Sequence, residues 1–374
     1  MKYLFEFYPT GSFMFSGESS LQSPKKGDGF LSKDPYSAKR ESFIVTSENL
    51  PPQTTMMGAI RYLLLKNEGY HPATDDAARL IGENTFNLAE PKEMGIIQEI
   101  SPVMLTGLID CEKTGKQEQI LLLPAPADHL NSNDNQNHPC AYAPIEKYNP
   151  KADLGGGYLA WRKGKDNQWI REEKCWYPAD KLFKSYTQAL HATTEDGADQ
   201  KGNQSFHMQE RVRLIDRRLS KGKGVISNPA FCVAVDLACE IQYGKIQDSF
   251  VSLGGRESVF KVRIKETPNI DLAGTENSHS SKKFYLLSPA WLPENWRNSE
   301  NGLEMAYLNT RRLRNAVTQV SKDAVSMKLN AERYIVADAG SVFIFKDHAK
   351  MKAFRNTIEA DPHTMCGFNR TAVL

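Results

Sequence analysis

Residues 250–265 read FVSLGGRESVFKVRIK, a pattern typical of one β-strand, an abrupt break and a second β-strand. After the break, apolar residues alternate with basic ones: Phe260, Val262 and Ile264 with Lys261, Arg263 and Lys265. Successive side chains of a strand point to opposite faces, so we expect one buried apolar face and one cationic face.

The break consists of Gly254, Gly255 and Arg256. Consecutive glycines let another group come close to the backbone, and they adopt dihedral angles that other residues avoid. An arginine here, followed by a strand with a cationic face, indicates a place where a phosphate backbone is held. The alternative interpretation is an ordinary tight turn with a solvated strand face.

The composition is that of an ordinary globular protein, with 374 residues, of which 40% are hydrophobic and 25% charged. This length allows two domains, or two domains and an insertion. The formal net charge of +2 is close to zero. Any surface for nucleic acid must therefore come from local segregation of charge.

No apolar run approaches the roughly 18 residues of a membrane span, and charges interrupt the N-terminus too early for a signal peptide. The six cysteines show neither a C-x-x-C pair nor regular spacing. We expect a cytoplasmic protein with free thiols, without a metal site, a cofactor or a membrane partner.

The clearest predicted helix follows Pro52 and ends at Gly69, a residue type common at helix C-termini. Its apolar residues recur at helical spacing: Met56, Met57, Ile60, Leu63 and Leu64. Thr54 is expected to cap the first turn, and Gly58 to let another backbone come close. Further helices are predicted over 75–81, 178–191 and 309–317.

Strands are predicted over 2–8, 42–46, 95–100, 103–109, 119–123, 206–216, 230–243, 283–288, 333–336 and 341–345. Short separations with turn residues favour antiparallel pairing. Polar stretches within 128–205 are typical of loops. We therefore expect an α+β protein with an N-terminal domain over 1–127, an insertion and linker region over 128–205, and a C-terminal domain over 206–374.

Most clusters of basic residues lie in the second half of the chain. The largest comprises Arg211, Arg213, Arg217, Arg218, Lys221 and Lys223, offset by Glu210 and Asp216; Arg311, Arg312 and Arg314 form another. Phosphate contacts from such groups give affinity that does not depend on nucleic-acid sequence and falls with salt. A solvated hairpin is the alternative interpretation of any one cluster.

Signals for catalysis are poor. The eight histidines lack i,i+4 metal spacing, and there is no phosphate-binding, zinc-protease or serine-hydrolase motif. His207, near Glu210 and Arg211, is the best candidate for a general acid–base residue in RNA cleavage, although packing is the more common role of a strand histidine. We interpret the chain as a binding protein and not as an enzyme.

Six segments occur in a characteristic order: Gly17 with Ser19 and Ser20, Pro52 to Arg61, Leu122 to Asp128, Glu210 to Asp216, Leu253 to Glu257, and Ala339 to Phe343. Together they resemble the RAMP superfamily of CRISPR proteins. They are most similar to the family of third subunits of type III-B (Cmr) effector complexes. The resemblance extends over nearly the whole chain.

This resemblance implies two ferredoxin-like (RRM-like) domains with antiparallel sheets and irregular insertions. It also implies a non-catalytic role in antiviral defence, in which the subunit binds the 5′ tag of the crRNA. Its implied neighbours are the large polymerase-like subunit and a backbone subunit. The chain lacks the Gly-Gly-Asp-Asp sequence of the large subunit, so that role is excluded.

The predicted RNA-binding residues combine the family segments with the basic clusters. From the segments come Ser19, Ser20, Thr55, Gly58, Arg61, Gly254, Gly255 and Arg256; from the clusters come Arg211, Arg213, Arg217, Arg218, Lys221, Lys223, Lys261 and Arg263. The helix after Thr54 and Thr55 would bring its N-terminus and Arg61 toward RNA, and the Gly-Gly-Arg turn would face the tag. A metal-independent RNA-processing endonuclease of the same superfamily and a stand-alone RNA-binding protein remain the alternatives.

Overall fold

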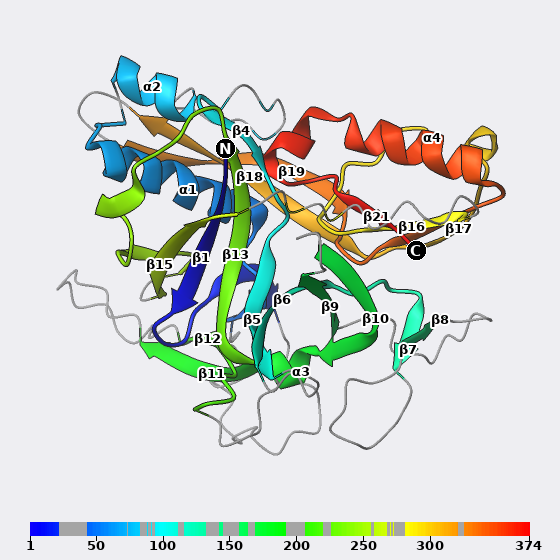
Figure 1. Ribbon diagram of the computed structural model, residues 1–374, viewed down its shortest axis with the longest axis horizontal. Coiled ribbons are helices and arrows are strands. Elements are labelled where there is room, and N and C mark those ends of the chain that lie inside the picture. The colour runs from blue at the N-terminus through cyan, green and yellow to red at the C-terminus, as the bar shows by residue number, and fades with distance from the viewer. Residues whose placement is uncertain are drawn as a thin grey trace, which may run out of the picture.

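A computed structural model describes residues 1–21, 43–72, 74–82, 88, 91, 94–110, 116–131, 142–144, 157–163, 169–191, 206–219, 226–255, 258–267, 270, 272, 281–320 and 325–374. The chain has a mixed α+β fold with several antiparallel sheets (Figure 1), which confirms the expected class. No helix in these ranges is long and apolar enough to cross a membrane.

The largest sheet has nine strands, and every pairing within it is antiparallel. Its order is β10 (Trp169–Pro178), β9 (Gly157–Lys163), β6 (Gln117–Pro124), β5 (Met104–Asp110), β13 (Ser227–Leu237), β1 (Lys2–Pro9), β15 (Val259–Glu266) and β14 (Phe250–Ser252), with β4 (Ile97–Ile100) also paired to β13. The sheet thus combines strands from all three predicted segments. The boundaries after residues 127 and 205 stay predictions.

One face of this sheet packs against helix α1 (Gln53–Glu68). Tyr3, Phe5 and Phe7 of β1 are fully buried there, because alternate residues of the strand point toward the helix. The predicted stripe of α1, from Met56 to Leu64, supplies the other side of this core. Together they form the largest hydrophobic cluster of the described residues.

The prediction for the C-terminal end of α1 is confirmed, whereas the prediction for its N-terminal end is not. Gly69 caps the C-terminus in the left-handed conformation, with φ of 75°, as expected. The prediction of a Thr54 cap is wrong, since Pro52 holds the N-cap position and no side chain caps the turn. Gly58 is exposed, and no atom beyond its chain neighbours and the nearby backbone of α1 lies within 4 Å of where its Cβ would be, so the expected close approach does not occur within the described chain. Helix α2 (Asp75–Ile81) follows as predicted.

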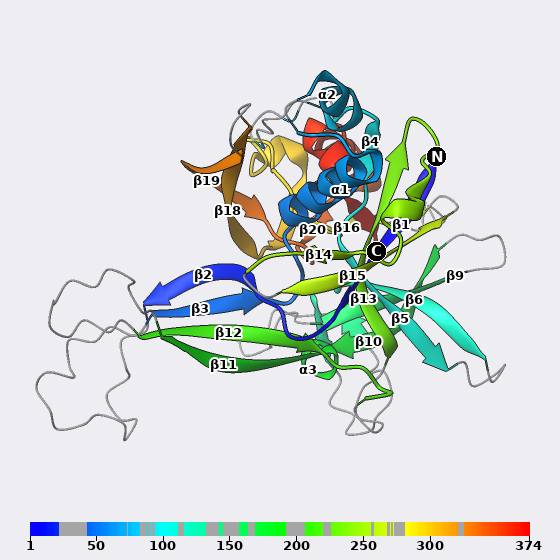
Figure 2. The same ribbon diagram turned by 90° about the vertical axis from the view of Figure 1, so that its left-hand side faces the viewer.

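A second, four-stranded sheet projects to one side of the molecule (Figure 2). Its order is β11 (Phe183–His191), β12 (Phe206–Leu214), β3 (Phe43–Glu48) and β2 (Phe15–Leu21). The predicted helix over 178–191 is wrong, because only the single turn α3 (Ala179–Leu182) is helical before β11 begins. Residues 183–191 each pair with a residue of β12, and this ladder overrides the helical spacing of their apolar side chains.

The C-terminal part contributes a third layer. Its sheet has the order β17 (Leu303–Tyr307), β20 (Val342–Phe345), β16 (Lys283–Leu286) and β21 (Thr371–Val373), and helix α4 (His348–Glu359) packs on it. Phe284 of β16 stacks on Phe343 and lies against Phe354 of α4. The opposite sheet face, through Tyr285 and Val342, packs on Leu4 and Cys232 of the nine-stranded sheet.

Two further strand pairs and three short 3₁₀ helices complete the described structure. The strand pairs are β18 (Thr310–Val320) with β19 (Val325–Ala337), and β7 (His129–Asn131) with β8 (Tyr142–Pro144). The 3₁₀ helices are Tyr243–Lys245, Ser299–Asn301 and Pro362–Cys366. The predicted helix over 309–317 is therefore wrong. Residues 310–314 and 316–317 pair with β19 in an antiparallel ladder, which has a register shift between Arg314 and Ala316.

Candidate RNA-binding surfaces

The Gly-Gly break makes a close backbone approach, as its sequence predicts. Gly254 has φ of +77°, and a Cβ there would overlap the carbonyl oxygen of Met14. The Gly255 amide donates a hydrogen bond to the same carbonyl over 2.9 Å, and the Met14 amide donates to Ser258 Oγ over 3.0 Å. The break therefore docks on the segment leading into β2. Arg256 and Glu257 lie outside the described residues, so the tag contact of Arg256 stays a prediction.

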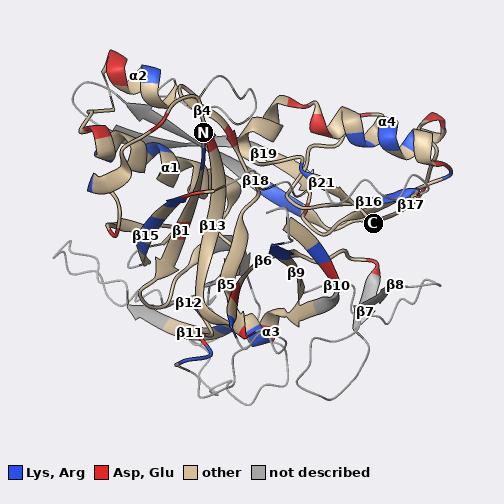
Figure 3. Cartoon of the chain, viewed as in Figure 1, with Lys and Arg blue, Asp and Glu red and all other residues tan. Residues whose placement is uncertain are grey.

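Strand β15 has the two faces that its alternation predicts. Phe260, Val262 and Ile264 are buried, whereas the three basic side chains point to the other face. Figure 3 shows these basic residues along β15.

Each cation of β15 has a carboxylate partner. Lys261 Nζ lies 2.9 Å and Arg263 Nε 3.5 Å from the Asp248 carboxylate, which is 52% exposed. Lys265 Nζ lies 2.6 Å from the buried carboxylate of Glu6. The sequence prediction missed these partners because Asp248 and Glu6 come from other parts of the chain.

An aromatic row crosses the cationic face of β15. Phe250 of β14 and Tyr8 of β1 are both in register with Lys261, so the three side chains lie side by side on one face. The Phe250 side chain is 55% exposed. The guanidinium carbon of Arg263 lies 5.0 Å from the centre of the half-buried Tyr8 ring, in cation–π contact. A flat exposed ring flanked by cations is an arrangement that suits single-stranded nucleic acid.

The Arg217–Arg218 turn adds to this face. Arg218 Nη2 lies 3.1 Å from Asp216, and that carboxylate is the first cause of a raised Arg218 pKa. Arg218 Nη2 also donates to Asn228 Oδ1 over 3.0 Å, at the start of β13, the strand beside β1, and an electrostatic interaction with Tyr8 contributes to the raised Arg218 pKa. We define the Tyr8 surface as Tyr8, Arg218, Phe250, Lys261 and Arg263; its cations are paired with Asp216 and Asp248. Arg217 pairs with Asp110 over 2.7 Å.

The remaining residues of the largest basic cluster lie elsewhere. Arg211 is only 5% exposed, and its guanidinium donates to the side chain and the carbonyl of Ser12, over 3.0 and 2.9 Å. Arg213 is exposed on β12. Lys221 and Lys223 lie outside the described residues. The phosphate contacts predicted for these four residues stay predictions.

The three predicted residues of α1 differ in exposure and in their contacts. Arg61 Nε donates to the Ile81 carbonyl at the end of α2 over 3.2 Å, and burial lowers the Arg61 pKa. Thr55 is half-buried and Gly58 is exposed, and both belong to the first half of the helix. Ser19 and Ser20 lie in β2, although their side chains are outside the described part of the chain.

The described histidines are engaged in structural hydrogen bonds or lie at the surface. His363 contacts Asp361 Oδ1 through Nδ1 over 2.5 Å and the Leu88 carbonyl through Nε2 over 2.7 Å. His348 contacts the Ser281 carbonyl over 2.7 Å, and His71 is exposed. The side chain of the candidate His207 is not among those described. Within the described residues, no group of three or more acidic, histidine or cysteine side chains could hold a metal ion.

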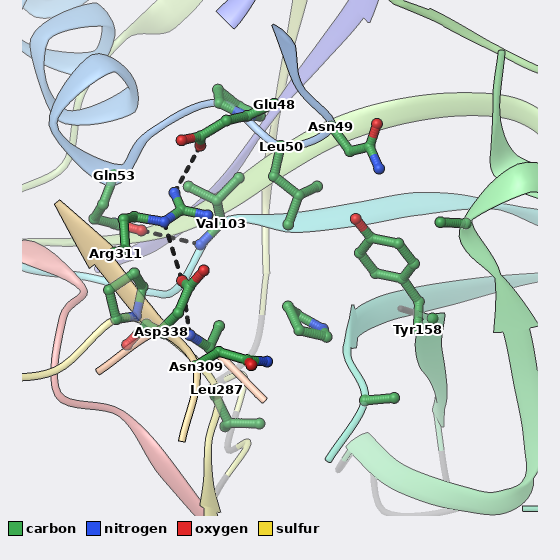
Figure 4. A pocket seen from close by; sticks show the side chains of 18 of the residues that line it. Glu48, Asn49, Leu50, Gln53, Val103, Tyr158, Leu287, Asn309, Arg311 and Asp338 are labelled. Carbon is green, nitrogen blue, oxygen red and sulfur yellow. Dashed lines mark hydrogen bonds and ion pairs between the residues drawn. The ribbon is translucent and has the colours of Figure 1, made fainter. Parts of the chain in front are cut away.

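A cavity of about 370 Å³ lies where the three layers meet (Figure 4). Its walls come from the connection between β3 and α1, the end of β6, the start of β9, and the loops after β16 and β19. Its polar side chains include Glu48, Asn49, Tyr158, Asn309, Arg311 and Asp338. Three of the family segments reach this cavity, through Gln53, through Pro124, Ala125 and Ala127, and through Ala339.

Arg311 forms one wall of the cavity and is held by two carboxylates. Its Nη1 lies 2.7 Å from Glu48 and its Nε 3.1 Å from Asp338. Tyr158 lies on the opposite side in Figure 4, and burial raises the pKa of its hydroxyl. The sequence interpretation assigned Arg311 to a basic cluster. In the sequence, only the family segments gave a signal for this cavity. These segments are far apart along the chain and come together only in the fold.

Comparison with known proteins agrees with the resemblance of the family segments. A family model described as "CRISPR-associated protein (Cas_Cmr3)" matches residues 30–160 and 143–374. Together with the α+β fold, this match places the chain among the CRISPR-associated proteins. The chain belongs to the Cas_Cmr3 family and is a Cmr-type subunit.

Two solved structures are similar over nearly the full chain. One is described as the type III-B Cmr-beta complex bound to cognate target RNA; the match has 13% identity, a TM-score of 0.48, and covers 100% of this chain and 99% of the other. The second is the same kind of complex with AMPPnP in state 1, at 10% identity, a TM-score of 0.46, and coverage of 98% and 95%. No curated protein matches this chain.

Proposed function

We propose that this chain is the non-catalytic subunit of a type III-B (Cmr) effector complex that binds the 5′ tag of the crRNA. The observation that carries the proposal is the row of Phe250, Lys261 and Tyr8, together with membership of the Cas_Cmr3 family. The row begins on the strand before the Gly-Gly break and continues on the strand after it.

Single-stranded RNA is held by stacking of bases on aromatic rings and by cations that contact its phosphates. Phe250 offers an exposed ring, and Lys261 lies beside it at a spacing set by the sheet. Arg263 and Arg218 extend the cationic side of the same surface. The geometry supports stacking of a base on Phe250 while an adjacent phosphate lies near Lys261 and Arg263.

The existing ion pairs do not prevent such binding. An exposed ion pair contributes about 0–1 kcal/mol, because water screens both charges. Asp248 is about half exposed, so a phosphate can take its place at little cost. The three cations of the Tyr8 surface also outnumber its two carboxylates.

The proposal is tested by measuring fluorescence anisotropy of a labelled repeat-derived tag RNA across a salt series. Phe250→Ala should lower affinity by roughly 5- to 150-fold, since a stacked base contributes about 1–3 kcal/mol. Lys261→Met should make the salt dependence shallower by about 0.7 in log–log slope. Lys346→Met, an exposed cation beside α4, is the matched control. Equal affinities for all four proteins would refute this surface as the tag site.

The wider role follows from the family resemblance. We infer that the subunit joins the large polymerase-like subunit to the Cmr backbone and acts in antiviral defence in the cytoplasm. We also infer that its sheets and helices form two ferredoxin-like domains of the RAMP type. Co-purification of the tagged chain from its native host tests this role: crRNA and both neighbouring subunits should come with it. A stable monomer without RNA would favour the stand-alone alternative.

A further inference from the structure

The cavity beside Arg311 differs from the Tyr8 surface in its charge. Its ionisable lining residues are Glu48, Arg311 and Asp338, together with the buried Tyr158. Arg311 already bonds both carboxylates, over 2.7 and 3.1 Å, so the lining carries a net charge of about −1 at neutral pH. A phosphate placed here would meet two carboxylates and a guanidinium that is already engaged. The cavity therefore disfavours an anion.

Neutral polar groups also line the cavity. Asn49 and Asn309 present amide side chains, which can donate and accept hydrogen bonds, and Tyr158 presents a phenol ring. The carboxylates of Glu48 and Asp338 are strong acceptors for hydroxyl and amino groups. At about 370 Å³ the cavity falls within the usual range for small-molecule sites, about 300–1,000 Å³.

We propose that this cavity binds the nucleoside part of one RNA nucleotide, base and ribose, while its phosphates stay outside. This inference rests on the proposed RNA-binding function. A base is uncharged and has donors and acceptors along its edge, which match the two asparagine side chains. The ribose 2′-hydroxyl is a donor that suits the carboxylates, so the site would distinguish RNA from DNA. In this proposal the Tyr8 surface would bind phosphates of the tag, and the cavity would bind one nucleoside.

The test uses the full-length protein and a set of tag RNAs, each with one base removed or one ribose replaced by 2′-deoxyribose. Binding is measured for wild type, Asn309→Ala and the control Asn356→Ala, which changes an exposed residue of α4. Asn309 is itself exposed, so its truncation should leave the fold intact. A thermal melt of each variant checks this directly.

At one tag position, removing the base should weaken wild-type binding about tenfold. Replacing the ribose at that position by 2′-deoxyribose should also weaken binding about tenfold. Each tenfold loss corresponds to roughly 1.4 kcal/mol of binding free energy. Asn309→Ala should bind intact RNA about tenfold more weakly, and base removal at that position should then have no further effect. Asn356→Ala should behave as wild type.

Two results would overturn the inference, and they differ from failure of the proposed function. If RNA binds, but removing a base or a 2′-hydroxyl weakens binding to Asn309→Ala by the same factor as binding to wild type at every position, the cavity holds no nucleoside. Inorganic phosphate at millimolar concentration is added to test for an anion site. If phosphate restores the affinity that was lost on removal of the base, or if it competes with intact RNA for wild type but not for Asn309→Ala, the cavity is an anion site. If no tag RNA binds at all, the proposed function and this inference fail together.

Discussion

Asp248 places its carboxylate 2.9 Å from the Nζ of Lys261, the cation to which the proposed function assigns a phosphate of the RNA. Asp248 has φ of 58°, a left-handed conformation that is uncommon for a non-glycine residue. A hydrogen bond from Lys261 is the first cause of its lowered pKa, and the charge of Arg263 contributes. The carboxylate therefore remains ionised, and under the proposed function it would compete with RNA for both cations.

Asp248→Asn should strengthen binding of tag RNA, because the competing charge is removed while the side-chain shape is kept. The log–log salt slope should steepen by about 0.7 if one more phosphate is neutralised. Asp248→Gly is the matched variant, since glycine adopts a positive φ without strain. Anisotropy titrations at several salt concentrations measure both. Weaker binding in the two variants would show that Asp248 orders the surface and does not compete with RNA.

Replacement of Gly254 and of Gly58 by alanine should change the stability of the protein in opposite directions. Gly254→Ala should destabilise the protein by at least about 2 kcal/mol, since φ is +77° and a Cβ would overlap the Met14 carbonyl. Gly58→Ala should stabilise it by about 0.5–1 kcal/mol, because the site is an exposed helix position with free space. Urea unfolding of the two variants measures both changes.

Gly58→Ala also tests the predicted RNA contact of α1. If the RNA backbone comes close to Gly58, this more stable variant should bind tag RNA more weakly than wild type. Unchanged affinity would remove Gly58 from the RNA-binding residues, whatever its effect on stability.

Arg311→Met should lower the free energy of unfolding by about 2 kcal/mol. It would leave the carboxylates of Glu48 and Asp338 side by side without their shared guanidinium. The control Arg79→Met removes a side chain that is 82% exposed and paired with Asp76, so it should change stability by under about 0.5 kcal/mol. Equal losses in the two variants would contradict a structural role for the Arg311 pairs.

Asp361 should make the free energy of unfolding depend on pH in the acid range. Burial raises its pKa, but hydrogen bonds from the His363 side chain and amide outweigh burial, so the folded-state pKa is lowered. Its contribution is thus fully present above the unfolded pKa of about 3.9 and is lost as pH falls through the lower folded value. Asp361→Asn should cost about 1 kcal/mol at pH 7 and less near pH 3. A constant difference in thermal unfolding across that range would argue against this linkage.

The protein should not cleave RNA. Incubation of purified protein with repeat RNA and EDTA should leave the RNA intact, and His207→Ala should give the same gel pattern as wild type. Specific cleavage that disappears in His207→Ala would instead support the metal-independent endonuclease.

Local pattern predicted the elements whose side-chain periodicity matches their burial. The alternation of residues 260–265 gave the correct faces of β15, and the spacing from Met56 to Leu64 gave the buried stripe of α1. The same reasoning failed for residues 183–191 and 310–317. Each of these segments pairs with a neighbouring strand. The hydrogen bonds of that pairing make the segment a strand, although its apolar residues recur at helical spacing.

The composition and local pattern determined an α+β chain with basic residues concentrated on particular strands, and the order of short segments indicated its family. Only the tertiary structure decided what those basic residues face. Asp248 and Glu6 are brought to β15 by the sheet, and Glu48 and Asp338 reach Arg311 from distant parts of the chain. Charge pairing depends on distances of a few ångströms, and such distances between remote residues are fixed by packing and not by local sequence.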